Sequence, residues 1–411
     1  MHLANKNSNL EKTILIVPAS YRMTELVHDD MITQLASPAR PAARGKAKPS
    51  KVQKTQVLPT ATEEASERAN LSARGGGEGE VANGAHETTA TGFQDIDKLQ
   101  EQGINAADLK KLKEAGLFSA FSVTYTTRKE LCNIKGLSEQ KVEKIQEAAR
   151  KLCDTGFMSG LDYMKMKTAN RFLLSTGSPK IDQLLGGGFE SGTTVELFGE
   201  FRCGKTQICH AASVIAQLPA SMGGASGKVC YIDTEGTFRA DRIITIAGFY
   251  GLDANQVLDN ILVARCFTHD TLATCLVQVA AKFAEERYAV LVVDSIMAPF
   301  RVDFSGRGEL ADRQQHLAKV MSRLQKLAEE FNLVVLMTNQ VMADPAAAMS
   351  FAANPPKPIG GHIMAHFSQL RLALRKGRAE QRIMKIYDSP ALPEGDAVFE
   401  ICDKGIQDAK D

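Results

Sequence analysis

The segment from Gly199 to Thr206 reads GEFRCGKT and carries the strongest chemical signal in the sequence. It fits the pattern G-x-x-x-x-G-K-[ST], follows the apolar run VELF and opens a helical stretch, which is the context of a phosphate-binding loop. Its glycines let backbone N–H groups and the helix N-terminus face phosphate oxygens. Lys205 is expected to reach the β- and γ-phosphates of ATP, and the Thr206 hydroxyl to bind Mg²⁺. The predicted nucleotide contacts of this loop are Gly199, Glu200, Phe201, Arg202, Cys203, Gly204, Lys205, Thr206 and Gln207.

Three polar residues that end or follow apolar strands complete a predicted hydrolytic site. Asp294 ends the run AVLVVD, where it can hold the magnesium ion through water. Glu235 follows KVCYID and is the preferred carboxylate to orient or deprotonate the attacking water, with Asp233 as its competitor. Gln340 ends LVVLMTNQ, and its amide can sense the γ-phosphate and transmit its presence to the segment that follows. A simple strand-end hydrogen bond is the alternative.

Two long segments leave the edge of the sheet at which ATP is expected. Residues 295–314 carry Arg301, Arg307 and Arg313 with two glycines, whereas residues 341–362 are rich in small residues and lack periodicity. Long structureless loops in a compact domain are usually functional, and arginines on glycine-hinged loops suit a phosphodiester backbone. We interpret both segments as nucleic-acid loops that nucleotide binding orders, with solvated loops as the alternative.

The elements that must position these residues lie in residues 174–411. Continuous apolar runs alternate there with helical stretches, a pattern typical of an α/β domain with a mostly parallel, doubly covered sheet. The last apolar runs are closely spaced, so they are expected to be antiparallel. The phosphate loop and this alternation together predict a P-loop ATPase core.

Three further regions precede this core. Residues 1–92 lack periodicity and are predicted to be a disordered extension. Residues 93–152 show helical spacings around the turn Lys135-Gly136-Leu137, which indicates a small helix-hairpin-helix unit. The N–H groups around Gly136 can meet a DNA phosphate without reading sequence, although a purely structural bundle is the alternative. Residues 153–173 are predicted to be a linker.

Composition limits the class of protein. The chain has 411 residues and 44% hydrophobic residues, enough for a full core, and no apolar run reaches the roughly 18–20 residues that span a bilayer. Its eight cysteines form no C-x-x-C pair, so we expect free thiols in a soluble, intracellular protein. The net charge is only +1, so any DNA-binding residues must be gathered locally.

The motifs GEFRCGKTQ, YIDTEGTFR, FSGRGELADRQ, PIGGHIMAH, LRKGR and IYDSP, taken together, resemble the RecA/RadA-type recombinases of eukaryotes and archaea over about residues 93–411. The segment ADPAAAMSFAANPPKPIGGH is especially similar to that of the meiosis-specific member. The resemblance implies a RecA-like fold, ATP and Mg²⁺ as cofactors, and DNA strand exchange in homologous recombination in the nucleus. It also implies helical filaments on single-stranded DNA that sample homologous double-stranded DNA.

The same resemblance implies roles for residues that spacing alone does not explain. Arg242 matches a residue that packs on adenine, and Asp388, Ser389 and Pro390 match a cap placed over the ATP of a neighbouring subunit. Phe157 and Gly160 match a polymerisation motif in which Gly160 replaces the usual alanine, and His366 matches an interface histidine. Arg301, Phe304, Arg307 and Arg313 match the first DNA loop.

Two rival functions remain open at this stage. A non-catalytic recombinase paralogue, acting as an ATP-binding mediator or adaptor, would bind nucleotide without forming filaments. A hexameric helicase with a RecA fold would unwind DNA without homology-dependent pairing. We expect the preferred recombinase to interact with recombination mediator proteins and to self-assemble into filaments or rings. We do not expect it to associate with a membrane.

Overall fold

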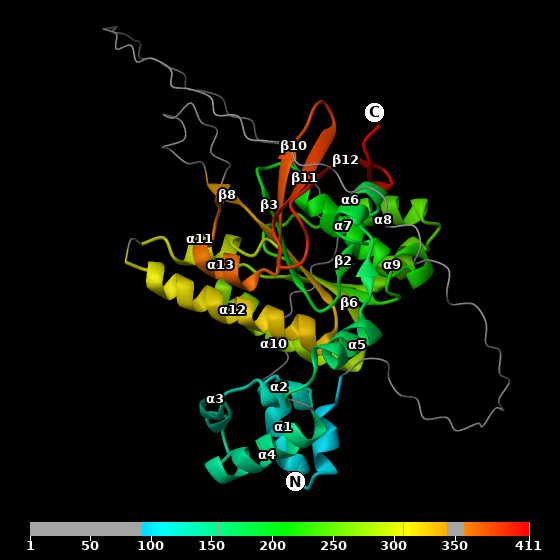
Figure 1. Cartoon of the computed structure of the whole chain (residues 1–411). Coiled ribbons are helices and arrows are strands. Elements are labelled where there is room, and N and C mark those ends of the chain that lie inside the picture. Colours follow the sequence, from blue (N-terminus) through cyan, green and yellow to red (C-terminus); the bar gives the residue numbers. More distant parts are fainter. Residues whose placement is uncertain (1–92, 154–155, 307, 343–356, 411) are drawn as a thin grey trace, which may run out of the picture. The chain divides into compact units, whose positions relative to one another are not determined.

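The computed structural model describes residues 93–153, 156–306, 308–342 and 357–410. The predicted disordered extension at residues 1–92 therefore lies outside the described residues. The first described elements are helical and short. They are a 3₁₀ helix at Ile96–Gln100, α1 at Ala106–Glu114, α2 at Ala120–Thr124, α3 at Arg128–Cys132 and α4 at Glu139–Leu152 (Figure 1).

Side-chain caps explain where these short helices begin. Asn105, Ser119 and Thr127 accept hydrogen bonds from backbone N–H groups in the first turns of α1, α2 and α3. Gly136 has φ of 85° in the turn between α3 and α4, a conformation that glycine adopts without strain. Ser138 is the N-cap residue of α4, although its side chain makes no capping hydrogen bond. The helices bury a shared apolar core of Ile96, Leu99, Leu109, Leu112, Leu131, Val142 and Ile145.

A helix lies within the predicted linker. α5 spans Gly160–Asn170, begins after the N-cap Ser159 and has no buried residue. Its apolar side chains are exposed: Leu161, Tyr163, Met164 and Met166. Sequence periodicity does not indicate this helix, because no residue of it is buried against the described part of the chain.

A nine-stranded sheet forms the centre of residues 173–410. Its strand order is β13-β12-β11-β10-β3-β7-β6-β4-β5 (Figure 1). The strands β10, β3, β7, β6, β4 and β5 are parallel to one another, and β11, β12 and β13 continue antiparallel. The predicted fold class is confirmed, including the antiparallel final strands. The bounds are β3 Thr194–Gly199, β4 Lys228–Asp233, β5 Ile261–Arg265, β6 Tyr288–Asp294, β7 Val334–Asn339, β10 Leu370–Lys376, β11 Gln381–Asp388, β12 Asp396–Cys402 and β13 Gly405–Asp408.

Alternate residues of each strand point to opposite faces of the sheet. Because the side chains on both faces are apolar, helices cover both faces. In β4, Val229 and Tyr231 belong to one apolar core and Cys230 and Ile232 to the other. Helices α6 Pro179–Leu184, α7 Lys205–Ile215, α8 Ala240–Phe249 and α9 Ala254–Asp259 pack in the first core. Helices α10 His269–Glu285, α11 Ala298–Asp303, α12 Leu310–Phe331 and α13 Gly361–Phe367 pack in the second.

Four short strands complete the description: β1 Leu173–Leu174 pairs with β2 Phe189–Glu190, and β8 Val341–Met342 pairs with β9 Lys357–Pro358. A 3₁₀ turn occupies Ala220–Met222. All eight cysteines are free thiols, as predicted. Among the described residues, no helix combines the length and the apolar character needed to cross a membrane.

A buried ion pair joins three neighbouring strands. Glu196 of β3 is fully buried and accepts from Arg371 Nε of β10 at 2.7 Å and from Asn339 Nδ2 of β7 at 2.6 Å. Asn339 also donates to the carbonyl of Ile359 at 2.7 Å. The pair therefore holds β3, and the loop that follows it, between its two parallel neighbours.

Candidate nucleotide site

The predicted phosphate loop connects β3 to α7. Gly204 has φ of 101° and Arg202 has φ of 62°, both in the left-handed region. A Cβ atom on Gly199 would lie 2.2 Å from the carbonyl oxygen of Leu374, so only glycine lets β10 approach this closely. The local backbone thus explains both glycines of the motif and places the N-terminus of α7 at the loop.

Lys205 points back into this loop. Its Nζ donates to the carbonyl oxygens of Gly199 at 2.8 Å and Glu200 at 2.7 Å. Burial lowers the pKa of Lys205. Phosphate oxygens are charged acceptors and form stronger hydrogen bonds with an ammonium than neutral carbonyls do. The Lys205 ammonium therefore lies in the loop, where it could bind phosphate oxygens in place of the two carbonyl groups.

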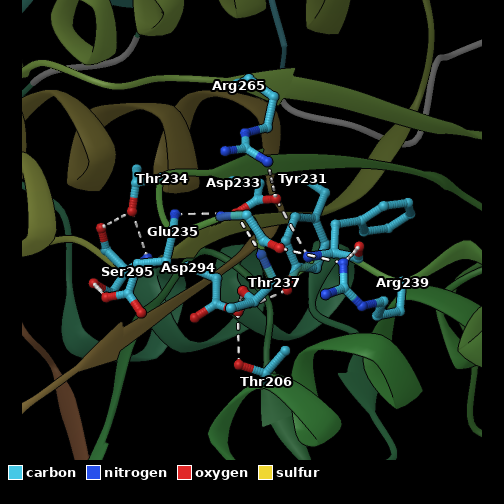
Figure 2. Close-up of polar contacts among 12 residues, drawn as sticks. Thr206, Tyr231, Asp233, Thr234, Glu235, Thr237, Arg239, Arg265, Asp294 and Ser295 are labelled. Carbon is cyan, nitrogen blue, oxygen red and sulfur yellow. Dashed lines mark hydrogen bonds and ion pairs between the residues drawn. The ribbon is translucent and has the colours of Figure 1, made fainter. Parts of the chain in front are cut away.

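Asp294 is the centre of a buried hydrogen-bond network at the end of β6 (Figure 2). Its Oδ2 accepts from Thr206 Oγ1 at 2.8 Å, from Tyr231 OH at 2.9 Å and from Thr237 Oγ1 at 3.1 Å. Its Oδ1 accepts from Thr338. Thr206 and Asp294 are the two residues predicted to hold Mg²⁺, and the structure brings their oxygen atoms into contact. A hydroxyl and a carboxylate are ligands of the type that Mg²⁺ prefers.

Asp233, the alternative to Glu235, is occupied by its own loop. Its two carboxylate oxygens accept from the backbone N–H groups of residues 235 to 238 at 2.7 to 3.2 Å. Arg265 lies 3.3 Å away as its ion-pair partner (Figure 2). Asp233 is also almost fully buried, whereas Glu235 is exposed. This geometry favours Glu235 as the carboxylate available to a water molecule.

A chain of polar side chains starts at Glu235. Its Oε1 accepts from Ser295 Oγ at 2.6 Å and from Gln340 Nε2 at 2.7 Å. The Oε1 of Gln340 in turn accepts from the Arg301 guanidinium of α11. Ser295 follows Asp294 through a cis peptide bond. The chain thus runs from the end of the phosphate site to the segment predicted to bind DNA.

Arg242, predicted to pack on adenine, lies beside the P-loop helix. Its Nε donates to Gln207 Oε1 at 2.8 Å, and its guanidinium also donates to the carbonyl of Cys402 in the turn between β12 and β13. Two predicted nucleotide contacts, on α7 and α8, are therefore joined directly. The hydrogen bond also ties them to the C-terminal strands.

Several polar residues of this site had no signal in the sequence. Thr237, Thr338 and Ser295 bind the two key carboxylates, and His210 lies buried behind them. Burial lowers the pKa of His210 to about 4, and its Nε2 accepts from the backbone N–H of Arg239 at 3.2 Å. The imidazole is therefore neutral. An alternating polar residue within an apolar strand, such as Thr338, is the only mark that could have indicated such a role.

The predicted ATP cap at residues 388–390 lies away from the nucleotide site of its own subunit. β10 is parallel to β3 with Leu374 opposite Gly199, so the carboxyl end of β10 shares the P-loop edge of the sheet. β11 is antiparallel to β10, and Asp388 lies opposite Arg371 near the start of β10. The segment 388–390 therefore lies toward the other edge of the sheet. His366 is exposed in α13, just before β10 begins.

The predicted assembly and DNA residues differ in exposure: Arg301 and His366 are exposed, whereas Phe304 and Arg313 are half-buried and Phe304 packs against the second core. Phe157 is fully exposed, and a Cβ on Gly160 would meet no atom of the described residues within 4 Å. Arg301 is exposed on α11, Phe304 follows that helix, and Arg313 lies in the first turn of α12. The carbonyl of Gly136 accepts from Lys111 Nζ at 3.0 Å. Arg307 and the segment 343–356 of the second loop lie outside the described residues.

Comparisons with known proteins agree on one family. The Rad51 family model matches residues 167–409. The meiotic recombination protein DMC1 homolog of Lilium longiflorum is 55% identical over 319 residues, which cover 78% of this chain and 91% of that protein. The DMC1/LIM15 homolog of Homo sapiens is 56% identical over 321 residues, covering 78% and 94%, and the DMC1 homolog of Arabidopsis thaliana is 53% identical over 319 residues, covering 78% and 92%. With its phosphate loop, parallel sheet and these similarities, the chain belongs to the Rad51 family of recombinases, ATPases that use a nucleotide with a metal ion and form filaments on DNA.

Proposed function

We propose that this protein is an ATP-dependent DNA strand-exchange recombinase that acts in meiotic homologous recombination in the nucleus. The observation that carries the proposal is the continuous chain of contacts from Glu235 through Gln340 to Arg301. It joins the place where the γ-phosphate would lie to the start of the first DNA segment. A protein that merely binds ATP would not need such a connection.

The P-loop residues bind and orient the nucleotide in this proposal. Lys205 exchanges its two carbonyl acceptors for oxygens of the β- and γ-phosphates. Thr206 and Asp294, whose oxygen atoms lie 2.8 Å apart, would hold Mg²⁺ between them and the nucleotide. The chemistry that the ion would supply is neutralisation of the charge that develops on the phosphoryl group during transfer. Arg242 and Gln207 form the wall on which the base rests.

Glu235 then orients or deprotonates the attacking water. Ser295 and Gln340 hold its Oε1 by hydrogen bonds of 2.6 and 2.7 Å, so its other oxygen is free to face the water. Loss of the γ-phosphate changes the environment of Gln340, and its contact with Arg301 transmits that change to α11. DNA affinity and nucleotide state are thereby coupled.

Assembly completes the site in this proposal. Because residues 388–390 lie toward the sheet edge away from Gly199, they cap the ATP of a neighbouring subunit. Phe157 and the exposed apolar side chains of α5 supply surface for that neighbour, with His366 at the same junction. The filament binds single-stranded DNA through Arg301, Phe304, Arg307 and Arg313, with Gly136 as an added phosphate contact. Homologous double-stranded DNA is then selected by base pairing, and recombination mediator proteins load the filament.

A strand-exchange assay with variants of the two central residues tests the proposal. Lys205→Arg and Glu235→Gln should lower DNA-stimulated ATP turnover by roughly 100-fold or more, because each loses a group that acts on the transferred phosphoryl or its nucleophile. Glu285→Gln, a change of the same type at an exposed ion pair at the end of α10, is the control and should behave as wild type.

Electron microscopy of the same proteins on single-stranded DNA provides the second measurement. Wild-type protein with ATP should form continuous filaments and pair them with a homologous duplex. Undiminished turnover in either variant, or isolated particles without homology-dependent pairing, would contradict the proposal.

A further inference from the structure

Two histidines and two carboxylates lie close together outside the nucleotide site, beside residues 295–314, the first segment predicted to bind DNA. His269 and Asp270 are the first two residues of α10, Asp303 is the last residue of α11, and His316 lies in α12. These helices pack on the face of the sheet that α7 does not cover. None of the four has a part in ATP binding or hydrolysis as described above.

Asp303 fixes the position and the proton of His269. Its Oδ2 accepts from the backbone N–H of His269 at 2.7 Å and lies 2.6 Å from the ring Nδ1. The Nδ1 must carry the proton of that contact, so the neutral ring has its lone pair on Nε2. A carboxylate on the far nitrogen is the usual support of a histidine that binds a metal, because it orients the ring and raises its basicity.

Two further ligand groups lie beside the ring of His269. Its Nε2 lies 3.3 Å from Asp270 Oδ1, and the ring of His316 stands at 86° to that of His269 with centroids 4.9 Å apart. One ligand atom from each of the three residues lies within 4.8 Å of the other two. Tetrahedral zinc with bonds of 2.0–2.1 Å needs ligand atoms roughly 3.3 Å apart, a difference that small side-chain rotations close.

Charge and ligand type distinguish this place from the magnesium site. Two imidazoles with one carboxylate suit zinc and similar transition metals, whereas Mg²⁺ prefers oxygen ligands alone. The N-terminus of α10 disfavours a cation, because the partial charge of the helix dipole is positive there. Asp270 and Asp303 offset this, because both carry negative charge beside His269. Asp303 is largely buried, with 17% of its side chain exposed, so water screens little of its negative charge.

We propose that His269, Asp270 and His316 form a binding site for a divalent transition-metal ion, Zn²⁺ by ligand type, with Asp303 orienting His269. The fourth position of the tetrahedron is left to water. The ion would fasten α10 to α12, and through Asp303 to α11, on both sides of residues 304–309. Phe304 packs beside both imidazoles, with its ring centroid 4.7 Å from that of His269 and 5.7 Å from that of His316. Metal binding would therefore hold the base of the first DNA segment.

Metal titration of the full chain, without ATP or DNA, tests the site independently of strand exchange. Protein stripped with a chelator is titrated with Zn²⁺ against a chromophoric competitor, and with Co²⁺ while visible absorption is recorded. We expect one tight equivalent of Zn²⁺ and the intense visible bands of tetrahedral Co²⁺. His316→Gln should abolish both signals, and Asp303→Asn should weaken Zn²⁺ binding about 10–100-fold through the loss of ring support.

Matched variants separate this site from other metal ligands and from misfolding. Asp270 has a side chain that is 82% exposed, so Asp270→Asn should fold normally and still weaken binding. Asp241→Asn, an acid in the first turn of α8, and His362→Gln, from the histidine pair of α13, should leave the tight equivalent unchanged. A tight equivalent that survives both His316→Gln and Asp270→Asn, a Co²⁺ spectrum with thiolate charge-transfer bands, or no tight binding by wild type would overturn the proposal.

Discussion

Replacing Arg371 by methionine should destabilise the core far more than its single ion pair suggests. Arg371 is 7% exposed and its partner Glu196 is fully buried, with Nε and Oε2 2.7 Å apart. Arg371→Met keeps most of the side-chain volume but leaves a buried carboxylate with Asn339 as its remaining donor. Breaking a buried pair in this way costs about 3–5 kcal/mol. The guanidinium also lies over the rings of Phe198 and Tyr387, which adds to the loss.

Urea unfolding followed by far-UV circular dichroism measures this cost, since the chain has no tryptophan to report by fluorescence. Arg375→Met is the matched control on the same strand: its side chain is 66% exposed and its contact with Asp396 is 4.0 Å long, so it should cost less than about 1 kcal/mol. The double variant Glu196→Gln with Arg371→Met removes the stranded charge and should regain about 2 kcal/mol. The reasoning is refuted if Arg371→Met costs no more than Arg375→Met, or if the double variant is less stable than Arg371→Met alone.

Three further outcomes are expected. Gln340→Met removes a hydrogen bond to Glu235 and the acceptor of Arg301, so DNA-stimulated ATP turnover should fall by about tenfold or more while nucleotide binding, measured by titration, is retained; equal stimulation in both proteins would argue against the coupling. Burial lowers the pKa of His210 from 6.5 to about 4, so the unfolded chain binds a proton in that window that the folded chain does not. Stability should therefore fall by about 3 kcal/mol as the pH drops from 6.5 to 4, and acid titration of His210→Gln should show that much less loss. The added Cβ of Gly160→Ala would meet no atom of the described residues within 4 Å and favours the first turn of α5, so light scattering should show assembly at a severalfold lower concentration; weaker assembly would contradict the assignment of Phe157 and Gly160 to a polymerisation motif.

The sequence by itself determined the fold class and located the candidate phosphate loop, because both depend on residues that are adjacent along the chain. The loop from Gly199 to Thr206 needs only its own backbone and the helix that follows to form a cradle for phosphates. Likewise, continuous apolar runs such as AVLVVD identify buried parallel strands without knowledge of their neighbours. Asp294 could be located for the same reason, since it ends such a run.

Tertiary structure decided which of these residues touch. Position along the chain favoured Glu235 over Asp233 as the carboxylate that acts on water, but only the fold shows that backbone N–H groups occupy Asp233 while Gln340 and Ser295 hold Glu235. The helix α5 gave no pattern because none of its residues is buried in the described part of the chain.

The separation of residues 388–390 from the P-loop edge depends on which strands β10 and β11 pair with and in which register, which hydrophobic patterns do not reveal. His269, Asp303 and His316 meet for a similar reason: three helices that are separate in the chain pack on one face of the sheet. Local patterns report which face of an element is buried, whereas the pairing of elements is set by the packing of the whole core, so contacts between distant residues appear only in the folded chain.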